Sequence, residues 1–443
     1  MFFGFMFGSV FGYENMLDPV YHALGWKGKP MTCLLYTSIW FRLRRVRPAD
    51  LIHVFKFISA WPFAQIYKRF RGHLWLLCEY GTEARDNAYY LFAYLRQEQP
   101  QVDAAYAISK NGRDFPKVRS LGETVEYGSW RHWLYYIAAE VNISSQKGGK
   151  PNAAVCYALE VSGLRKNTRA FLQHGVIKDD LPFLHYKYTK MRLFSCAAKP
   201  EFEFVRDTFG YPDGYVQYLG LCRFDALHAA KADLSLILIA PTWRHYLYFD
   251  CDSHETSGCD FLESDYYKAW SSLLSSPDFL NLIHSSGKRV IFCPHRNMQR
   301  YAKFFSSPDP SVSVLCWENE DITELIHRAG MLITDYSSIF MDFAYMKRPV
   351  LYYQFDYEKF RSGHMPLGYF DYKKDAFGPI CGTPEVLIRE LKLTLERDCQ
   401  MEPVYLERQR RFFEIYDNQN CERTYLAINE ICNEKHRKTK QSH

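Results

Sequence analysis

From residue 74 onward, the chain alternates short apolar runs with longer amphipathic segments. The runs are continuously apolar, and each ends in turn-forming residues. Such runs are typical of strands that are buried on both faces of a parallel sheet, and helical spacers between them form βαβ units. Strands are expected at 74–81, 103–109, 170–175, 235–241, 289–295, 331–335 and 350–356. The pattern predicts an α/β fold.

A polar stretch, CRFDALHAAKADL at 222–234, separates two strand-rich blocks of similar size. We therefore predict two doubly wound, Rossmann-like domains, residues 73–228 and 229–433, that face each other across a cleft. Ligands of such sheets bind beyond the carboxyl ends of the strands. The candidate functional residues are accordingly those that directly follow a strand.

The stretch MLITDYSSIFMDFAYMKRPV breaks an apolar strand with a polar turn. Thr334, Asp335, Ser337 and Ser338 form this turn, and the apolar residues after it recur at helical spacing. A helix start of this kind offers unpaired N–H groups and a positive dipole end to an anion such as phosphate. Capping alone is the alternative, since serine and aspartate cap many helices that bind nothing.

The run FLQHGVIKDDL places His174 and Gly175 directly after a predicted strand. An imidazole in this position can act as a general base near neutral pH, and the glycine lets a ligand approach the backbone. A buried structural histidine is the alternative, although the next polar residues, Lys178, Asp179 and Asp180, argue against apolar surroundings. The adjacent carboxylates do not predict a metal site, because neighbouring side chains diverge and no third ligand is apparent.

Two further strand ends carry groups that suit phosphate. APTWRHY places Arg244 after one strand, and CPHRNMQRY places His295, Arg296 and Asn297 after another. Arginine offers a planar fork for phosphate oxygens, and an imidazole can donate to a bridging oxygen. Either group alone is compatible with a surface cation, but three such strand ends in one domain indicate an anion site.

The first strand is followed by the turn of CEYGTEARDNAYYLF, which contains Gly81. The turn has neither GxGxxG nor GxxxxGK[ST]. This absence speaks against a dinucleotide-dependent dehydrogenase and a P-loop kinase.

The formal net charge of +5 is concentrated toward the two ends of the chain. Residues 39–72 carry eight basic and one acidic side chain, and residues 434–443 form a basic tail. The region between them has an acidic balance, so the body of the protein lacks the basic surface that nucleic acid requires. The thirteen cysteines include no CxxC pair and no Cys/His spacing that suits zinc, which fits a reduced cytoplasmic compartment.

Residues 39–72 mix the basic side chains with aromatic rings. This mixture suits a helix that lies in a membrane interface on anionic lipid. A partly buried helix with a solvated basic face is the alternative, because amphipathicity does not separate the two. Pro48 and Pro62 are expected to break the segment. No apolar run reaches the length of a transmembrane helix.

The first 38 residues are expected to be non-native. The hexapeptide CLLYTS at 33–38 resembles the translation of a transposon-end adapter, and an ordinary apolar segment is the alternative. The opening apolar part has no basic residue before it, so it does not predict a secretory signal.

The chain resembles the CDP-glycerol glycerophosphotransferase family, the teichoic-acid and capsule polymerases of bacteria. The resemblance spans about 72–430 and rests on FLQHGVIKDDL, YLGLCRFD, APTWR and ITDYSSIFMDFAYMKRPVLYYQFD. It implies a GT-B fold, with the donor bound mainly by the second domain and the acceptor facing the first. It also implies a location at the cytoplasmic face of the membrane, as a peripheral protein.

The resemblance assigns roles to the candidate residues. His174 would deprotonate an acceptor hydroxyl, which attacks the β-phosphorus of CDP-glycerol and expels CMP. His295 matches a second essential histidine that contacts the donor phosphate, and Arg244 with the turn at 334–338 would complete the phosphate cradle. Phosphoryl transfer needs positioning and charge neutralisation more than covalent help, and neither a cofactor nor a metal is expected.

Two departures from the family pattern fall at the site. Better-known members have Trp where this chain has Gln173, and an R-x-H pattern where it has Cys293, Pro294 and His295. They leave open whether the donor is CDP-glycerol or CDP-ribitol, and which lipid-linked polymer is the acceptor. Two other classes remain open: a GT-B glycosyltransferase that uses a nucleotide-sugar, and a non-catalytic membrane-associated scaffold.

Overall fold

The computed structural model describes residues 48–161, 167–244, 246–247, 261–316, 322–362 and 366–441. The expected non-native segment, 1–38, and the first part of the basic segment, 39–47, lie outside these residues.

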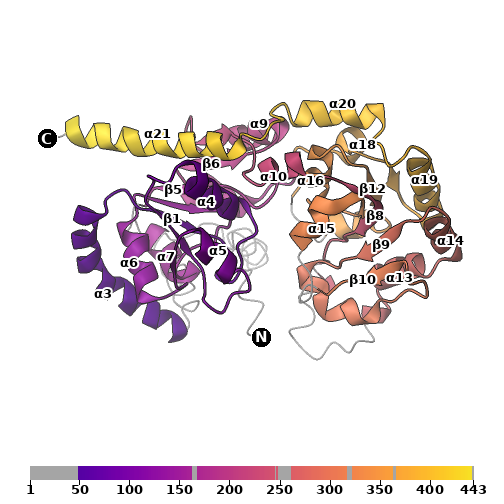
Figure 1. Ribbon diagram of the computed structural model, residues 1–443, viewed down its shortest axis with the longest axis horizontal. Coiled ribbons are helices and arrows are strands. Elements are labelled where there is room, and N and C mark those ends of the chain that lie inside the picture. The colour runs from indigo at the N-terminus through magenta and orange to yellow at the C-terminus, as the bar shows by residue number, and fades with distance from the viewer. Residues whose placement is uncertain are drawn as a thin grey trace, which may run out of the picture.

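Two parallel sheets, one in each half of the chain, form the centre of the structure (Figure 1). The first sheet has seven strands in the order β3-β2-β1-β4-β5-β6-β7, and the second has six in the order β10-β9-β8-β11-β12-β13. In the first sheet the strands are β1 (Trp75–Cys78), β2 (Ala104–Ala107), β3 (Glu123–Val125), β4 (Val141–Ser144), β5 (Arg169–Phe171), β6 (Leu193–Cys196) and β7 (Val216–Tyr218). In the second they are β8 (Asp233–Ile239), β9 (Arg289–Phe292), β10 (Val312–Val314), β11 (Ala329–Thr334), β12 (Val350–Tyr353) and β13 (Ile380–Cys381). All seven expected strands are present, and the α/β prediction is confirmed.

Helices cover both faces of each sheet. The first half of the chain contains α3 (Pro48–Phe70), α4 (Asn87–Glu98), α5 (Phe115–Leu121), α6 (Trp130–Ala138), α7 (Ala153–Val161), η1 (Pro182–Leu184), α8 (Tyr186–Thr189), α9 (Lys199–Thr208) and α10 (Phe224–Ala229). The second half contains α13 (Asp265–Leu274), α14 (Pro277–Ser285), η3 (Arg296–Phe304), α15 (Ile322–Arg328), α16 (Phe340–Tyr345), α17 (Tyr357–Ser362), α18 (Tyr372–Asp375), α19 (Pro384–Glu396), α20 (Pro403–Phe412) and α21 (Asn420–Gln441).

The continuous apolar runs form strands because both faces of each sheet lie under apolar side chains. Every residue of β1 and β12 is buried. Successive residues of β11 enter different cores, with Leu332 in one apolar cluster and Ile333 in the other. A strand buried in this way cannot alternate apolar with polar residues.

The last helix, α21, returns to the first domain and lies along it in Figure 1. Its buried residues Ile428 and Ile431 belong to the same apolar cluster as Trp75 and Leu77 of β1. The expected limit of the second domain at residue 433 is therefore incorrect, since α21 closes the core of the first domain. The basic segment at 434–443 is not a separate tail, because α21 continues to Gln441.

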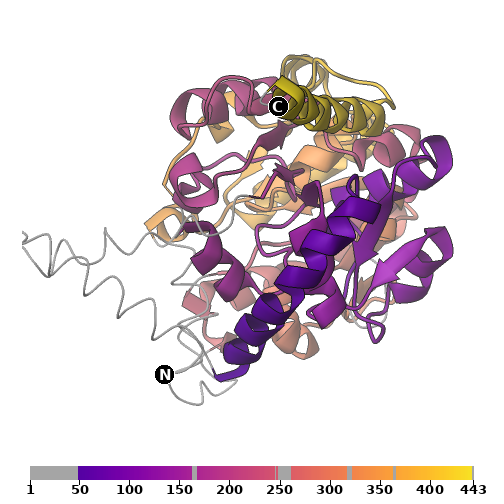
Figure 2. The same cartoon turned by 90° about the vertical axis from the view of Figure 1, so that its left-hand side faces the viewer.

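Helix α3 also belongs to the first domain. It packs on α6 through Ala60 and Ala64, which are fully buried, and Figure 2 shows it running across the outer side of that domain. The helix begins at Pro48 and continues through Pro62, so the expected break at Pro62 is wrong. None of the helices within the described ranges combines the length and apolarity needed to cross a bilayer.

Candidate active site

His174 follows β5 at the junction of the two domains, and its partner is Asp86. Nδ1 of His174 lies 2.5 Å from Oδ2 of Asp86, the N-cap residue of α4. Because a carboxylate accepts, Nδ1 carries the proton and Nε2 keeps a free lone pair. This is the arrangement of a general base held in one tautomer by a carboxylate.

The electrostatics of His174 agree with this role. Burial lowers the pKa of His174, but the charge and hydrogen bond of Asp86 more than compensate, so the pKa lies above its ordinary value. The side chain is 71 % exposed, so a ligand can reach the ring.

Asp86 is itself held by a buried carboxylate that the sequence did not reveal. Glu79 accepts from the backbone N–H groups of Arg85, Asp86 and Tyr89 at 2.9, 3.1 and 2.9 Å. Burial and the nearby charge of Asp86 raise the pKa of Glu79 to about 8. Both acids lie in the CEYGTEARDNAYY turn, where an aspartate directly before a helix was the available signal.

Arg223, from the YLGLCRFD motif, links the two domains at the site. Its Nη1 donates to the carbonyl oxygen of His174 at 2.7 Å and lies 3.3 Å from Oδ1 of Asp86. Its Nη2 donates to Oδ1 of Asp342 on α16 at 2.7 Å. Arg223 was not among the predicted site residues, and the structure shows that it links His174 to the second domain.

The serine turn of the second domain lies against the His174 loop. A Cβ atom on Gly175 would be 3.6 Å from Oγ of Ser338 and 3.8 Å from Nη2 of Arg223. Ser338 is exposed and Ser337 is half-buried, so both hydroxyls can reach a ligand. The following helix, α16, has only six residues, so its dipole would add little to an anion contact at this turn.

Thr334 and Asp335 do not face a ligand, which corrects the prediction for these two residues. Both are fully buried. Thr334 Oγ1 donates to the carbonyl of Ala240 at 2.7 Å. Asp335 Oδ1 accepts from the N–H groups of Thr242 and Tyr336 at 2.7 and 2.6 Å. They hold the turn in shape.

Arg244 is likewise a structural residue, and the predicted direct phosphate contact is wrong. It is 1 % exposed, with Nη1 2.8 Å from Asp335 Oδ2 and Nε 2.8 Å from Asp356 Oδ2. Four aromatic rings surround the guanidinium at 5.1–5.6 Å. The side chain turns beneath the serine turn, and its charge neutralises two buried aspartates.

His295 follows β9 and begins η3. Its Nδ1 accepts from the backbone N–H of Asn297 at 3.2 Å, so in the neutral ring the proton sits on Nε2, which is free to donate. Burial, with the nearby charges of His174 and Arg296, lowers the pKa of His295 to about 4. The charge of His174 therefore reaches His295, so the two histidines, which come from different domains, lie near each other.

Arg296 supports the same junction, whereas Gly81 packs within the first domain. Arg296 Nη1 pairs with Oε1 of Glu83 in the first domain at 2.9 Å. A Cβ atom on Gly81 would lie 2.5 Å from the ring of Tyr127, so this glycine permits close packing of the turn. Asn297 contributes its backbone N–H to His295, as described above.

The Lys178, Asp179 and Asp180 side chains are committed to ion pairs. Asp179 pairs with Lys178 and, at 2.8 Å, with Arg361 of α17. Asp180 pairs with His185 at 2.8 Å. The two carboxylates diverge as expected, and they fasten the His174 loop to the second domain and to its own domain.

Gln173 points away from the site residues, although the family pattern placed this departure at the site. It is buried with a φ of 61°, and its amide donates to Glu201 at 3.1 Å. Its effect on His174 is therefore exerted through the backbone turn.

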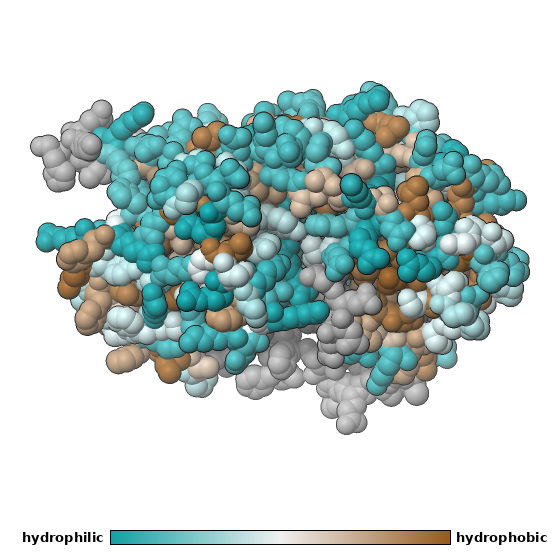
Figure 3. All heavy atoms as spheres, viewed as in Figure 1, coloured by the Kyte–Doolittle hydropathy of each residue, from teal (hydrophilic) through white to brown (hydrophobic). Residues whose placement is uncertain are grey.

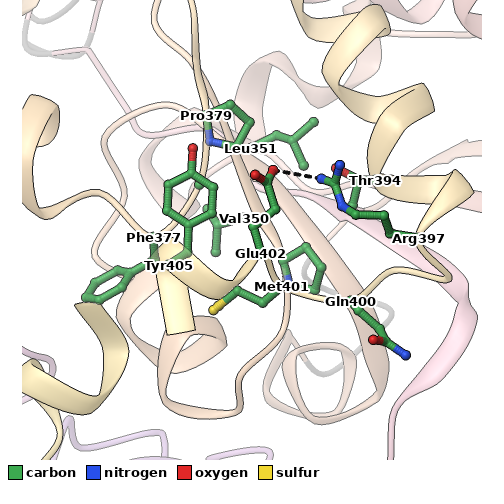
Figure 4. Close-up of a pocket in the computed structure, with 12 residues that line it drawn as sticks. Val350, Leu351, Phe377, Pro379, Thr394, Arg397, Gln400, Met401, Glu402 and Tyr405 are labelled. Carbon is green, nitrogen blue, oxygen red and sulfur yellow. Dashed lines mark hydrogen bonds and ion pairs between the residues drawn. The ribbon is translucent and has the colours of Figure 1, made fainter. Parts of the chain in front are cut away.

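A small recess elsewhere carries none of these residues (Figure 4). It lies at the amino ends of β12 and β13, and Glu402 and Arg397 neutralise each other there at 2.8 Å. Its position is opposite to the strand ends that carry the predicted groups.

The fold and site define a two-domain protein of the GT-B type with a histidine–carboxylate pair at the domain junction. A solved structure of the wall teichoic acid polymerase TagF has a TM-score of 0.62 at 17 % identity, covering 89 % of this chain and 98 % of that one. Residues 201–430 match the family model for CDP-glycerol:poly(glycerophosphate) glycerophosphotransferase. The chain belongs to this family, as its motifs had predicted.

Curated relatives agree with this membership. The minor teichoic acid biosynthesis protein GgaB of Bacillus subtilis (strain 168) is 28 % identical over 371 residues, which cover 82 % of this chain and 40 % of GgaB. The teichoic acid poly(glycerol phosphate) polymerase of Bacillus spizizenii is 32 % identical over 162 residues, which cover 37 % of this chain and 36 % of that protein. The chain thus spans less than half the length of these two relatives.

Proposed function

We propose that the protein transfers glycerol phosphate from CDP-glycerol to a hydroxyl of a lipid-linked glycan or poly(polyol phosphate) acceptor in teichoic-acid or capsule-type synthesis. The family membership supports the substrate class. The observation that carries the proposal is the Asp86–His174 pair, which lies beside the Ser337–Ser338 turn and close enough to His295 for its charge to lower the pKa of that residue.

In the proposed reaction, the acceptor oxygen attacks the β-phosphorus of CDP-glycerol. Nε2 of His174 takes the hydroxyl proton while the new P–O bond forms, and Asp86 stabilises the resulting imidazolium. The bond from the β-phosphorus to the bridging oxygen breaks, and CMP leaves with that oxygen. The products are the extended acceptor, CMP and the proton on His174.

The second domain would hold the phosphate groups. His295 is neutral near pH 7 because its pKa is lowered to about 4, so it would donate from Nε2 rather than act as a cation. The hydroxyls of Ser337 and Ser338 would supply further donors. Such preorganised donors stabilise charge that develops on the transferred group. We propose that this transfer needs neither a metal nor another cofactor, since this arrangement supplies the base and the donors.

We further propose that α3 places the protein on the anionic cytoplasmic face of the membrane. Seven of its apolar side chains are more than half exposed: Leu51, Ile52, Phe55, Ile58, Phe63, Ile66 and Phe70. Lys68 and Arg69 lie in its last turn. Figure 3 shows apolar side chains gathered at the end of the first domain where α3 lies. An interfacial helix of this kind would bring the site to a lipid-linked acceptor.

The test is incubation of the purified protein with CDP-glycerol, CDP-ribitol or UDP-sugars and a lipid-linked acceptor, followed by identification of the released nucleotide. CMP release with CDP-glycerol is expected. Release of CMP from CDP-ribitol alone would change the polyol, whereas UDP release would indicate a glycosyltransferase. Release from no donor would indicate a scaffold.

His174→Ala should abolish turnover while leaving CDP-glycerol binding nearly intact, because the donor is held by the second domain. Equilibrium binding and CMP release measure the two properties separately. Turnover that survives in this variant would show that His174 is not the base.

A further inference from the structure

A group of potential metal ligands lies at the amino end of the first sheet, away from the proposed active site. His73 precedes β1, Glu140 directly precedes β4, and His436 lies near the end of α21. β1 and β4 are neighbours with Trp75 paired to Val141, and Glu140 N–H donates to the carbonyl of Leu74 at 2.9 Å. The sheet therefore fixes two of the three residues side by side, and α21 brings the third.

The three side chains converge on one point. Nδ1 of His73 is 3.2 Å from Oε2 of Glu140, and Nε2 of His436 is 2.6 Å from Oε1. The candidate ligand atoms all lie within 4.8 Å of one another. Ligands of a tetrahedral zinc ion, with bonds of about 2.0–2.1 Å, are roughly 3.3 Å apart. Small side-chain rotations would thus admit the ion.

The surroundings also suit an ion. The Glu140 side chain is only 5 % exposed, and each of its two oxygens faces an imidazole nitrogen, of His73 or of His436. A buried carboxylate oxygen carries a desolvation cost that a cation would offset. The His73 and His436 side chains are 73 % and 40 % exposed, so the ion has a path from solvent.

We propose that His73, Glu140 and His436 bind a divalent transition-metal ion, zinc by the nature of this ligand set, and that the ion fastens α21 to the first sheet. Two histidines with one glutamate form a known zinc ligand set. At its other end, α21 is tied to the domain junction, where Asn420 N–H donates to Asp225 at 2.8 Å. The metal would hold the helix that connects the second domain back to the first.

The experiment uses the full chain without an affinity tag, stripped with a chelator and dialysed. Zn²⁺ titration by calorimetry, elemental analysis and thermal unfolding are measured for the wild type, His73→Gln, Glu140→Gln and a control, His284→Gln. His284 is an exposed histidine of α14 in the other domain. His73→Gln changes an exposed side chain, so the test does not depend on the folding of the Glu140 variant.

The wild type and the control should bind one Zn²⁺ per chain and unfold at a higher temperature with Zn²⁺. Both ligand variants should bind about tenfold or more weakly and lose the thermal shift. Equal Zn²⁺ affinity in the wild type and His73→Gln would overturn the proposal and leave a simple ion-pair cluster. None of these measurements depends on transferase activity, so they fail or succeed independently of the proposed function.

Discussion

Replacing Asp86 by Asn tests the Asp86–His174 pair. The variant keeps the size of the side chain and a capping oxygen for α4, but removes the charge that lies 2.5 Å from Nδ1. The amide can also donate to Nδ1, which would place the proton on Nε2 and remove the basic lone pair. A positioned general base contributes about 10²–10⁴-fold, which corresponds to about 2.7–5.4 kcal/mol of barrier. We expect a loss of kcat/KM in that range.

The pH profile gives a second readout of the same change. The wild-type base works when His174 is unprotonated, so activity should fall as the pH drops through its raised pKa. Without the charge of Asp86, burial dominates and lowers the pKa of His174. The acidic limb of the pH–activity profile should therefore move to lower pH, and the maximal activity should fall.

CMP release from CDP-glycerol, measured between pH 5 and 9, provides the assay. Asp278→Asn is the matched control, because Asp278 lies in the first turn of α14, is exposed, and is far from the site along the second domain. If Asp86→Asn retains activity within about twofold of this control, or if its acidic limb does not move, the assigned role of Asp86 is refuted.

Three further predictions follow from the geometry. Arg244→Met should lower the free energy of unfolding by about 3–5 kcal/mol, because Asp335 and Asp356 lose their buried partner. Urea denaturation measures this change, and a decrease below about 1 kcal/mol would contradict the structural role of Arg244. The double variant Phe55→Glu, Ile58→Glu should sediment less with anionic vesicles than the control variant Leu367→Glu, which changes an exposed leucine of the second domain. Equal binding of the two variants would show that α3 does not contact the membrane. CMP release should not depend on added Mg²⁺ or Mn²⁺, and strong activation by either ion would show that the proposed donors are insufficient.

Much of the fold was readable from the chain because burial imposes a local pattern. A strand covered on both faces must be continuously apolar, so β1, β11 and β12 appear as apolar runs without any knowledge of their neighbours. Short or partly polar strands such as β4, VNIS, carry too few apolar residues to stand out. The length of α3 was misjudged because Pro62 is tolerated where the helix faces solvent.

The sequence offered several of the groups that the structure gathers at the domain junction. His174 follows β5 and His295 follows β9, and the packing of the two domains brings them close enough for the charge of His174 to lower the pKa of His295. Arg244 also follows a strand, yet its side chain turns inward, because two buried aspartates provide better partners than solvent. The position of a residue in the sequence does not determine the direction in which its side chain points.

What the sequence determined by itself is therefore local: the apolar runs, the turns after them, the residue types offered at strand ends and the family that these motifs define. Only the tertiary structure decided the partners, such as Asp86 for His174, Arg223 between the domains, and α21 returning to meet His73 and Glu140. The reason is physical. Periodicity reports the burial of each residue, whereas contacts between residues far apart in the chain depend on strand order and helix packing, which no single segment encodes.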